Sequence, residues 1–240
     1  MKHLSVSLVC LIVLSALVFP HAAEARVPQH GMTVQTHQHD GSSQGRYSKE
    51  REEMIERTQP SGKIMDAMGI KPGMVVAEIG AGGGRFAVRL AERVGDAGKV
   101  YANDIDPDAL EFMKKRCREE KIQNMIVVEG GETDPRLPLA ALDVVALVHT
   151  LHMVKKPVPL LKNIIATLKP GGVLAVIDAD PEKFARMNRD AEGLPSNEQV
   201  MRLLNDAGFE LVSEHTFLPL HFFWILRPRE EADQAANPRE

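Results

Sequence analysis

The chain of 240 residues is 44% hydrophobic, carries 29 Lys and Arg against 33 Asp and Glu, and has a formal net charge of -4 at pH 7. This length suits one sizeable α/β domain and excludes two domains of ordinary size. The lack of a basic excess and the aromatic content of 5% leave neither the charge nor the stacking surface that nucleic-acid binding needs, so no nucleic-acid partner is expected.

The amino-terminal segment is organised like a secretory signal peptide. Lys2 is followed by an apolar run over residues 4–19 and by the pattern Ala23-Glu24-Ala25, and a basic start, a short apolar stretch and an A-x-A site mark such a signal. The apolar run is shorter than the roughly 20 residues of a membrane-spanning helix. We therefore predict a signal peptide over residues 1–25, cleavage after Ala25, a periplasmic or secreted protein, and no stable membrane insertion. An uncleaved amino-terminal membrane anchor is the alternative.

The next segment, residues 26–46, is rich in Gln, His, Ser and Gly and poor in large apolar side chains. Such a composition cannot offset the entropy lost on ordering, so a disordered linker is predicted. The histidines of this linker lack a cysteine or another partner at metal-ligand spacing, and no metal is expected. The folded domain is predicted over residues 47–228, and a charged, flexible tail over residues 229–240.

Helix and strand signals begin near residue 50. Two helices are expected first, at Glu50–Arg57 and Ser61–Met68. The predicted strands are residues 74–79, 99–105, 125–128, 144–148, 173–177, 210–217 and 221–226. The predicted helices between them are residues 85–94, 106–120, 157–168 and 196–207. The loop over residues 180–195 and the segment over residues 47–60 are expected to cover the site.

This order of elements predicts the fold class. Strands that alternate with helices form a parallel sheet with helices on both faces, and continuous apolar runs fit strands that are buried on both sides. The last two strands are closely spaced, so an antiparallel pair is expected there. The sequence therefore predicts a Rossmann-like α/β fold with a doubly wound, seven-stranded, mostly parallel sheet and an antiparallel C-terminal strand pair.

A glycine-rich turn, residues 78–84 with the sequence EIGAGGG, follows the first predicted strand. Glycine permits positive φ and lets the backbone approach a ligand closely, and ligands of such sheets bind at the carboxyl ends of the strands. A dinucleotide fingerprint, G-x-G-x-x-G, would place its third glycine at Arg85 or Ala87. That match is imperfect, and a dinucleotide stays open as an alternative.

A different pattern in the same turn is an acid followed by glycines at alternate positions. Glu78 comes first, and then Gly80, Gly82 and Gly84. An acid at the end of a strand suits a cofactor with a cationic amino-acid group better than it suits a pyrophosphate. The next strand also ends in an acid, Asp104, and carboxylates at this position accept hydrogen bonds from nucleotide ribose hydroxyls.

Together these residues resemble the class I S-adenosylmethionine-dependent methyltransferases, from about Tyr47 to Arg227. Residues 134–138 and 168–172 are similar to a bacterial, exported subgroup of that family whose substrate is unknown. The resemblance implies S-adenosylmethionine as the cofactor. The cofactor-binding residues that it implies are Glu78, Gly80, Ala81, Gly82, Gly84, Asp104, Ile105, Gly131, Glu132 and Val148. Family members usually have an acid where this chain has Gly131, and Glu132 is expected to replace it in contacting the adenine.

The segment after the fourth strand is expected to border both cofactor and acceptor. There His152 matches a histidine that is common in the subgroup, and because imidazole titrates near neutrality it is the candidate general base. A purely structural role for His152 is the alternative, and nothing in the resemblance marks His149. Asp178 and Asp180, after the fifth strand, are expected either to contact the acceptor or to cap the next helix.

The predicted function is the transfer of a methyl group from S-adenosylmethionine to a small-molecule acceptor. The cofactor carries the reactive group, so the protein mainly positions the reactants and excludes water. Two alternatives remain at this point. One is an NAD(P)-dependent oxidoreductase, because the same glycines are involved. The other is a non-catalytic module that binds S-adenosylmethionine, because of Gly131 and the export signal.

Overall fold

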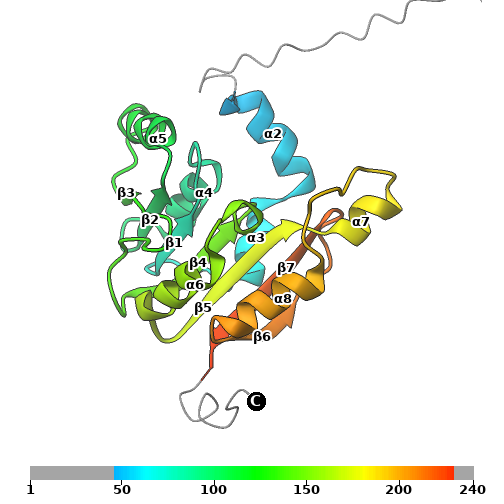
Figure 1. Cartoon of the computed structure of the whole chain (residues 1–240). Coiled ribbons are helices and arrows are strands. Elements are labelled where there is room, and N and C mark those ends of the chain that lie inside the picture. Colours follow the sequence, from blue (N-terminus) through cyan, green and yellow to red (C-terminus); the bar gives the residue numbers. More distant parts are fainter. Residues whose placement is uncertain (1–45, 230–240) are drawn as a thin grey trace, which may run out of the picture. The chain divides into compact units, whose positions relative to one another are not determined.

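The computed structural model describes residues 46–229, whose central element is one seven-stranded sheet with the strand order β3-β2-β1-β4-β5-β7-β6 (Figure 1). The strands are β1 (Val75–Ile79), β2 (Lys99–Asp104), β3 (Met125–Glu129), β4 (Leu142–Val148), β5 (Leu168–Ala179), β6 (Phe209–Glu214) and β7 (His221–Pro228). The helices are α2 (Lys49–Thr58), α3 (Ser61–Ala67), α4 (Arg85–Val94), α5 (Pro107–Glu119), η1 (Leu151–Met153), α6 (Pro157–Thr167), α7 (Pro181–Arg186) and α8 (Asn197–Asp206).

The pairing of the strands confirms the predicted fold class. Strands β1 to β5 pair in parallel, whereas β7 pairs antiparallel with both β5 and β6. The strand order reverses between β1 and β4, which lie side by side in the sheet. In open α/β sheets the ligand binds outside the carboxyl ends of the strands at such a reversal. The topology therefore places the expected site beyond Ile79 and Val148.

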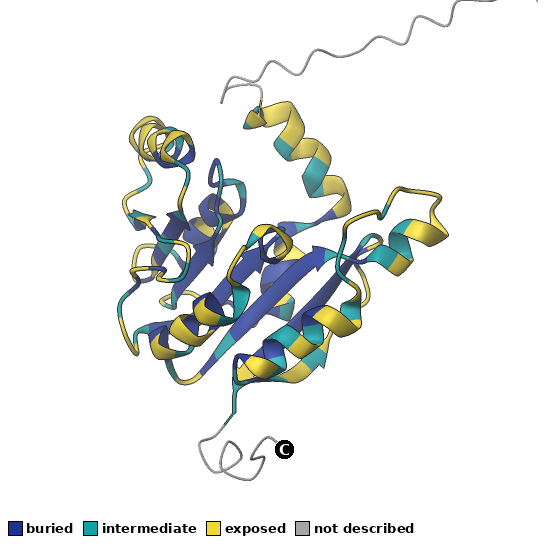
Figure 2. Ribbon diagram, viewed as in Figure 1, coloured by how far each residue is buried: buried dark blue, intermediate teal, exposed yellow. Residues whose placement is uncertain are grey.

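Hydrophobic side chains cover both faces of the sheet. On one face, Phe86 and Leu90 of α4 are 1% exposed and pack with Met113 of α5, which is completely buried. On the other face, Leu161 of α6 and Leu204 of α8 are completely buried. Figure 2 shows the result, with a buried sheet between helices whose outer surfaces are exposed. This two-sided burial explains why the central parts of β1, β4 and β5 are apolar.

Three predicted segments differ from the structure by more than two residues, and η1 was not predicted. Strand β5 begins at Leu168 and not at residue 173, because Leu168 already pairs with Leu142 before a register shift. Strand β6 ends at Glu214, three residues before its predicted end. The predicted loop over residues 180–195 contains α7. Its start has a cap, since the Asp180 side chain accepts hydrogen bonds from the amides of Glu182 and Lys183.

The predicted signal peptide, nearly all of the predicted linker and most of the predicted tail lie outside residues 46–229 and stay predictions. Within residues 46–229, the helices are too short or too polar for any of them to traverse a lipid bilayer.

Candidate active site

The glycine turn is tied to the neighbouring strands through its backbone. The amides of Gly80 and Ala81 both donate to the carbonyl oxygen of Asn103 at the end of β2, at 2.8 and 2.9 Å. Gly80 has a φ of 73°, and a Cβ atom there would lie 2.3 Å from Cγ2 of Thr150, the second residue after β4. Only glycine fits this contact without displacing its neighbour. Gly82 and Gly84 also have positive φ, 54° and 77°.

The carboxylate of Asp104 connects the turn to the end of β2. One oxygen accepts a hydrogen bond from the Gly82 amide at 2.7 Å, and the other accepts from the amides of Ile105 and Asp106 at 2.7 and 2.9 Å. The neighbouring Ile105 side chain is 60% exposed. An apolar side chain left open beside a nucleotide-type turn offers a surface for a flat apolar ring. The structure thus places Asp104 and Ile105 together at the edge of the turn.

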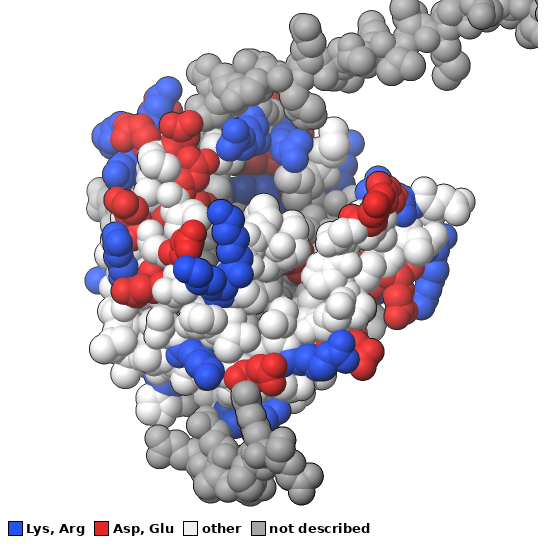
Figure 3. All heavy atoms as spheres, in the orientation of Figure 1, with Lys and Arg blue, Asp and Glu red and all other residues white. Residues whose placement is uncertain are grey.

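A pocket of about 420 Å³ lies between the glycine turn, the end of β4 and helix α2, within the usual size range of small-molecule sites. Of the predicted cofactor residues, Glu78, Gly80, Ala81, Gly82 and Val148 line it. Arg85, Gln59 and His149 also line it, and none of these three was predicted as a site residue. Figure 3 shows a hollow in the upper part of the surface, with both signs of charge around it.

The most unusual side chain in the pocket is Glu78. Its residue is 3% exposed, and burial raises the pKa of its carboxyl to about 8, although the guanidinium of Arg85 and the amide of Ala87 act in the opposite direction. Within residues 46–229, the Glu78 Oε2 and Arg85 Nη1 atoms are buried without a hydrogen-bond partner, although Nη1 lies 3.8 Å from Oε2 of Glu56 in a long ion pair. Unpaired buried polar atoms are costly, so this pair is arranged for a ligand with polar groups of both signs.

S-adenosylmethionine fits these observations. Its amino-acid part carries an ammonium group and a carboxylate, which Glu78 and Arg85 would hold. The glycine turn and Asp104 would hold its nucleoside part, beside Ile105. When bound, the cofactor supplies a methyl group on a positively charged sulfur.

The predicted adenine contacts after β3 are arranged differently. The Gly131 amide donates to the carbonyl oxygen of Asp134 at 2.7 Å, so this glycine serves the turn that follows it. The Glu132 carboxylate is 3.2 Å from Nζ of Lys156, and both side chains are more than half exposed. The structure brings neither Gly131 nor Glu132 into the pocket lining, and their contact with the cofactor stays a prediction.

Two histidines after β4 have opposite electrostatic surroundings. Nδ1 of His152 lies 2.6 Å from Asp178, whose carboxylate also accepts from the His152 amide at 3.1 Å, and this bond raises the pKa of His152. His149 lines the pocket, and burial lowers its pKa to about 4. The Asp178 carboxylate fixes the orientation of the His152 ring, as it would for a general base or for a purely structural histidine, so the role of His152 stays a prediction.

We expect the substitution Asp178→Asn to lower the pKa of His152, because the amide removes the negative charge that stabilises the imidazolium. The raised pKa of His152 stabilises the fold below its ordinary value of about 6.5, and that stabilisation is lost as the pH rises through the raised value. The variant should therefore lose more stability at about pH 5.5 than at about pH 8.5. Histidine titration by NMR and urea unfolding at both pH values check this.

Asp190→Asn is the control for this prediction, since the carboxylate of Asp190 is exposed and accepts from the Glu192 amide. An equal loss of stability at both pH values in Asp178→Asn would contradict the proposed charge pairing and would leave only a packing role for Asp178.

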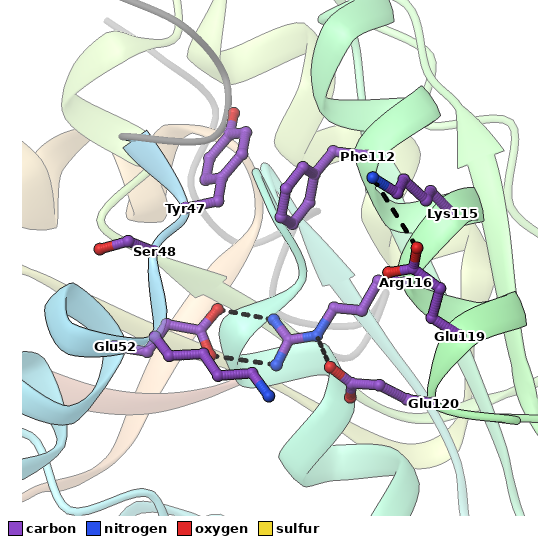
Figure 4. A pocket seen from close by; sticks show the side chains of 9 residues that line it. Tyr47, Ser48, Glu52, Phe112, Lys115, Arg116, Glu119 and Glu120 are labelled. Atoms are coloured by element: carbon purple, nitrogen blue, oxygen red, sulfur yellow. Dashed lines mark hydrogen bonds and ion pairs between the residues drawn. The ribbon is translucent and has the colours of Figure 1, made fainter. Parts of the chain in front are cut away.

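Helix α2 is fastened across the glycine turn. The guanidinium of Arg116 on α5 donates to both carboxylate oxygens of Glu52 on α2, at 2.6 and 3.0 Å, and to Glu120 at 3.1 Å (Figure 4). The rings of Tyr47 and Phe112 lie 4.9 Å apart beside this clamp. The Tyr47 ring also covers the turn, because a Cβ atom on Gly83 would lie 2.4 Å from it.

The far end of α2 closes over the end of β4. Oε1 of Gln59 lies 2.9 Å from Nε2 of His149, and the Gln59 residue is 6% exposed. The segment over residues 47–60 was expected to cover the site, and Tyr47, Ile55 and Gln59 do line the pocket. The contacts at its two ends were not predicted, because each joins residues far apart in the chain. The acidic first turn of α2 was visible, but its partner on α5 was not.

We expect Arg116→Met to loosen α2 selectively. Methionine keeps the length of the side chain but removes the guanidinium, and Glu52, whose side chain is 17% exposed, would lose its counter-charge. Breaking one half of a largely buried pair costs on the order of 2 kcal/mol after allowance for partial exposure. Hydrogen exchange should become faster in α2 than in β1 or β4. Arg118→Met, which removes a 65% exposed side chain from a surface pair, is the control. Unchanged hydrogen exchange in α2 would contradict the proposed stabilisation of α2 by the Arg116–Glu52 pair.

Comparisons with known proteins agree with this geometry. Residues 70–208 match the family described as "Methyltransferase domain". The demethylmenaquinone methyltransferase of Lactococcus lactis is 30% identical over 116 residues, which are 48% of this chain and 46% of that enzyme. The ubiquinone/menaquinone biosynthesis C-methyltransferase UbiE of Shewanella woodyi is 24% identical over 178 residues, which cover 62% of this chain and 71% of that protein.

Among solved structures, a SAM-dependent methyltransferase from Aquifex aeolicus has a TM-score of 0.66 and 24% identity, and the alignment covers 75% of this chain and 98% of that one. This likeness shows the fold. The chain spans about half the length of the Lactococcus enzyme, since the alignment covers 46% of it.

The family match covers the glycine turn, Asp104 and the residues after β4, whereas Tyr47, α2 and Gln59, which also line or border the pocket, lie before the matched range. It confirms S-adenosylmethionine, and not a dinucleotide, as the cofactor of this site. The chain belongs to the methyltransferase domain family.

Proposed function

We propose that the chain transfers the methyl group of S-adenosylmethionine to a small-molecule acceptor. One observation carries this proposal. Glu78 and Arg85, which line a pocket beside the glycine turn, each have a buried polar atom without a hydrogen-bond partner. These groups suit the charged end of the cofactor and leave the rest of the pocket for the acceptor. Methyl transfer needs the two reactants held in line and shielded from water, and α2 covers the pocket for that purpose.

The acceptor class that we propose is a small aromatic molecule of the naphthoquinone type. Two related methyltransferases support it by their names, one for demethylmenaquinone and one for ubiquinone and menaquinone biosynthesis. Ile55 and Val148 give the pocket apolar surface on two sides, which suits a flat, uncharged ring.

Calorimetry of the full chain with S-adenosylmethionine is the first test, and binding is expected. Transfer of labelled methyl groups is then measured with a short-chain demethylmenaquinone supplied in reduced form, and with pools of other small molecules. Binding of NADH in place of S-adenosylmethionine would refute the proposal. Binding without formation of S-adenosylhomocysteine, whatever the acceptor, would point to the non-catalytic module.

We further propose that the protein is exported and cleaved after Ala25. The support is the signal-like order of residues in the first 25 positions. An exported enzyme needs a supply of cofactor outside the cytoplasm, so the location bears directly on turnover. Cell fractionation with amino-terminal sequencing tests this, and an intact Met1 in the cytoplasmic fraction would refute it.

A further inference from the structure

The side chain of His149 is placed in the pocket with one ring nitrogen already engaged. Its Nε2 lies 2.9 Å from Oε1 of Gln59, and an amide oxygen can only accept a hydrogen bond. The proton of the neutral ring therefore resides on Nε2, which leaves Nδ1 as a bare acceptor. Within residues 46–229, the hydrogen bond recorded for the ring is the one through Nε2, and His149 is among the residues that line the pocket.

The backbone of His149 has an unusual conformation. Its φ is 57°, a left-handed value that few residues other than glycine adopt. Such strain costs on the order of 1 kcal/mol and is typically retained where the side chain has a task. The His149 amide donates to the carbonyl oxygen of Ile177 at 2.8 Å, and the ring packs edge-on against His221 with their centroids 4.4 Å apart. Both contacts fix the ring in place.

Burial and the charges around His149 together keep its ring neutral. Burial is the largest effect, and Arg85 and His152 also lower its pKa, whereas Asp178 acts in the opposite direction. His221, which packs against the ring, itself has a pKa lowered to about 4. With a pKa of about 4, His149 accepts a hydrogen bond at every physiological pH. The neutral ring is therefore a poor base, but it can accept a hydrogen bond at physiological pH.

We propose that His149 binds a hydroxyl group of the methyl acceptor through Nδ1 and so selects hydroxylated aromatic acceptors, with Gln59 as the positioning residue that fixes its tautomer. This inference rests on the proposed function. For a quinone-type acceptor it predicts that the reduced form, which carries hydroxyl groups, binds and that the oxidised form does not. The Glu78 and Arg85 side chains would remain with the cofactor, and the proposal assigns His149 to the acceptor.

The test uses the full chain loaded with S-adenosylhomocysteine and two matched probes, 1-naphthol and 1-methoxynaphthalene. NMR of chain labelled with nitrogen-15 in histidine follows the two ring nitrogens of His149. We expect 1-naphthol to shift the Nδ1 resonance and to bind about tenfold more tightly than its methyl ether, the value of one good hydrogen bond. Equal affinities, or no binding of either probe, would overturn the proposal.

Two variants separate the proposal from a structural role. His149→Gly keeps the left-handed backbone and removes the ring, so it should abolish the preference for 1-naphthol, and added imidazole should restore it. Gln59→Leu should shift the proton of His149 from Nε2 toward Nδ1 and weaken 1-naphthol binding. His215→Asn is the control, since His215 lies outside the pocket lining. It should change neither the preference for 1-naphthol nor the position of the His149 proton.

The affinity for S-adenosylhomocysteine distinguishes the two proposals. It should stay within about threefold of wild type in His149→Gly. If it falls as far as the affinity for 1-naphthol, His149 serves the cofactor and the inference is wrong. If S-adenosylmethionine and S-adenosylhomocysteine fail to bind the wild-type chain, the proposed function itself is wrong.

Discussion

Replacement of Gly80 by alanine is expected to destabilise the protein and to abolish cofactor binding. A Cβ atom at this position would lie 2.3 Å from Cγ2 and 2.4 Å from Oγ1 of Thr150. Thr150 cannot easily move, because the residue is 7% exposed and its hydroxyl donates to the carbonyl oxygen of Val148 at 3.1 Å. The positive φ of Gly80 adds backbone strain. Together the strain and the overpacking should cost about 3 kcal/mol of unfolding free energy.

The affinity for the cofactor should fall together with the stability. Relief of the clash between the new Cβ atom and Thr150 must move either the turn or the end of β4, and both line the pocket. Urea unfolding and calorimetry with S-adenosylmethionine measure the two effects. Gly62→Ala is the matched control. Gly62 lies in α3 with open space around it, so alanine there should stabilise the helix slightly, by about 0.5 to 1 kcal/mol. Normal cofactor affinity in Gly80→Ala would refute the assigned role of the turn.

The substitution Glu78→Gln should have opposite effects on stability and on cofactor binding. Glutamine has the same shape but cannot carry the negative charge that an ammonium group prefers. Hydrogen bonds to charged groups contribute about 1.5 to 3 kcal/mol, so affinity for S-adenosylmethionine should drop about 10- to 100-fold.

Stability should rise at the same time, and the sign follows from the pKa of Glu78. Burial raises this pKa to about 8 from an ordinary value of 4.5. Between these values the folded protein holds a proton that the unfolded chain releases, so the wild type loses stability as the pH rises through this range. Glu78→Gln does not titrate, and it should be more stable than the wild type by on the order of 2 kcal/mol at neutral pH.

The difference in stability should be small near pH 5 and widen toward about pH 8. Calorimetry in buffers of different ionisation enthalpy should show that the wild type releases about one proton on cofactor binding at neutral pH, while Glu78→Gln releases none. Glu92→Gln, on the exposed side of α4 with a side chain that is 59% exposed, is the control. A constant gap in stability across this pH range would show that Glu78 is ionised in the free protein.

The fold was largely predictable because its signals are local and repeated. The central parallel strands contain apolar runs, and the glycines at positions 80, 82 and 84 mark the turn after β1. The start of β5 was missed because Leu168 pairs before a register shift, which apolar runs do not reveal. Helix α7 was missed although Asp180 and Pro181 form an ordinary helix start, because its six residues have no long apolar period.

The candidate site was predictable on the cofactor side and much less so on the acceptor side. Glu78 and Asp104 stand at strand ends, where sequence position fixes their place in the sheet. The tautomer of His149 depends instead on Gln59, which is 90 positions away in the chain. His152 was named as a candidate base from its ordinary pKa, and its contact with Asp178 was not predicted. That contact arises only when β4 and β5 lie side by side.

The strap formed by residues 47–59 has a thermodynamic consequence. Its first residue, Tyr47, lies on the glycine turn, and its last, Gln59, lies on His149, so one rigid segment contacts both halves of the pocket. A ligand that contacts this segment in its closed position favours closure over opening, and by reciprocity two such ligands strengthen each other's binding by the same factor. We therefore expect cofactor and acceptor to bind cooperatively, and we expect the opening of α2 to limit the release of spent cofactor.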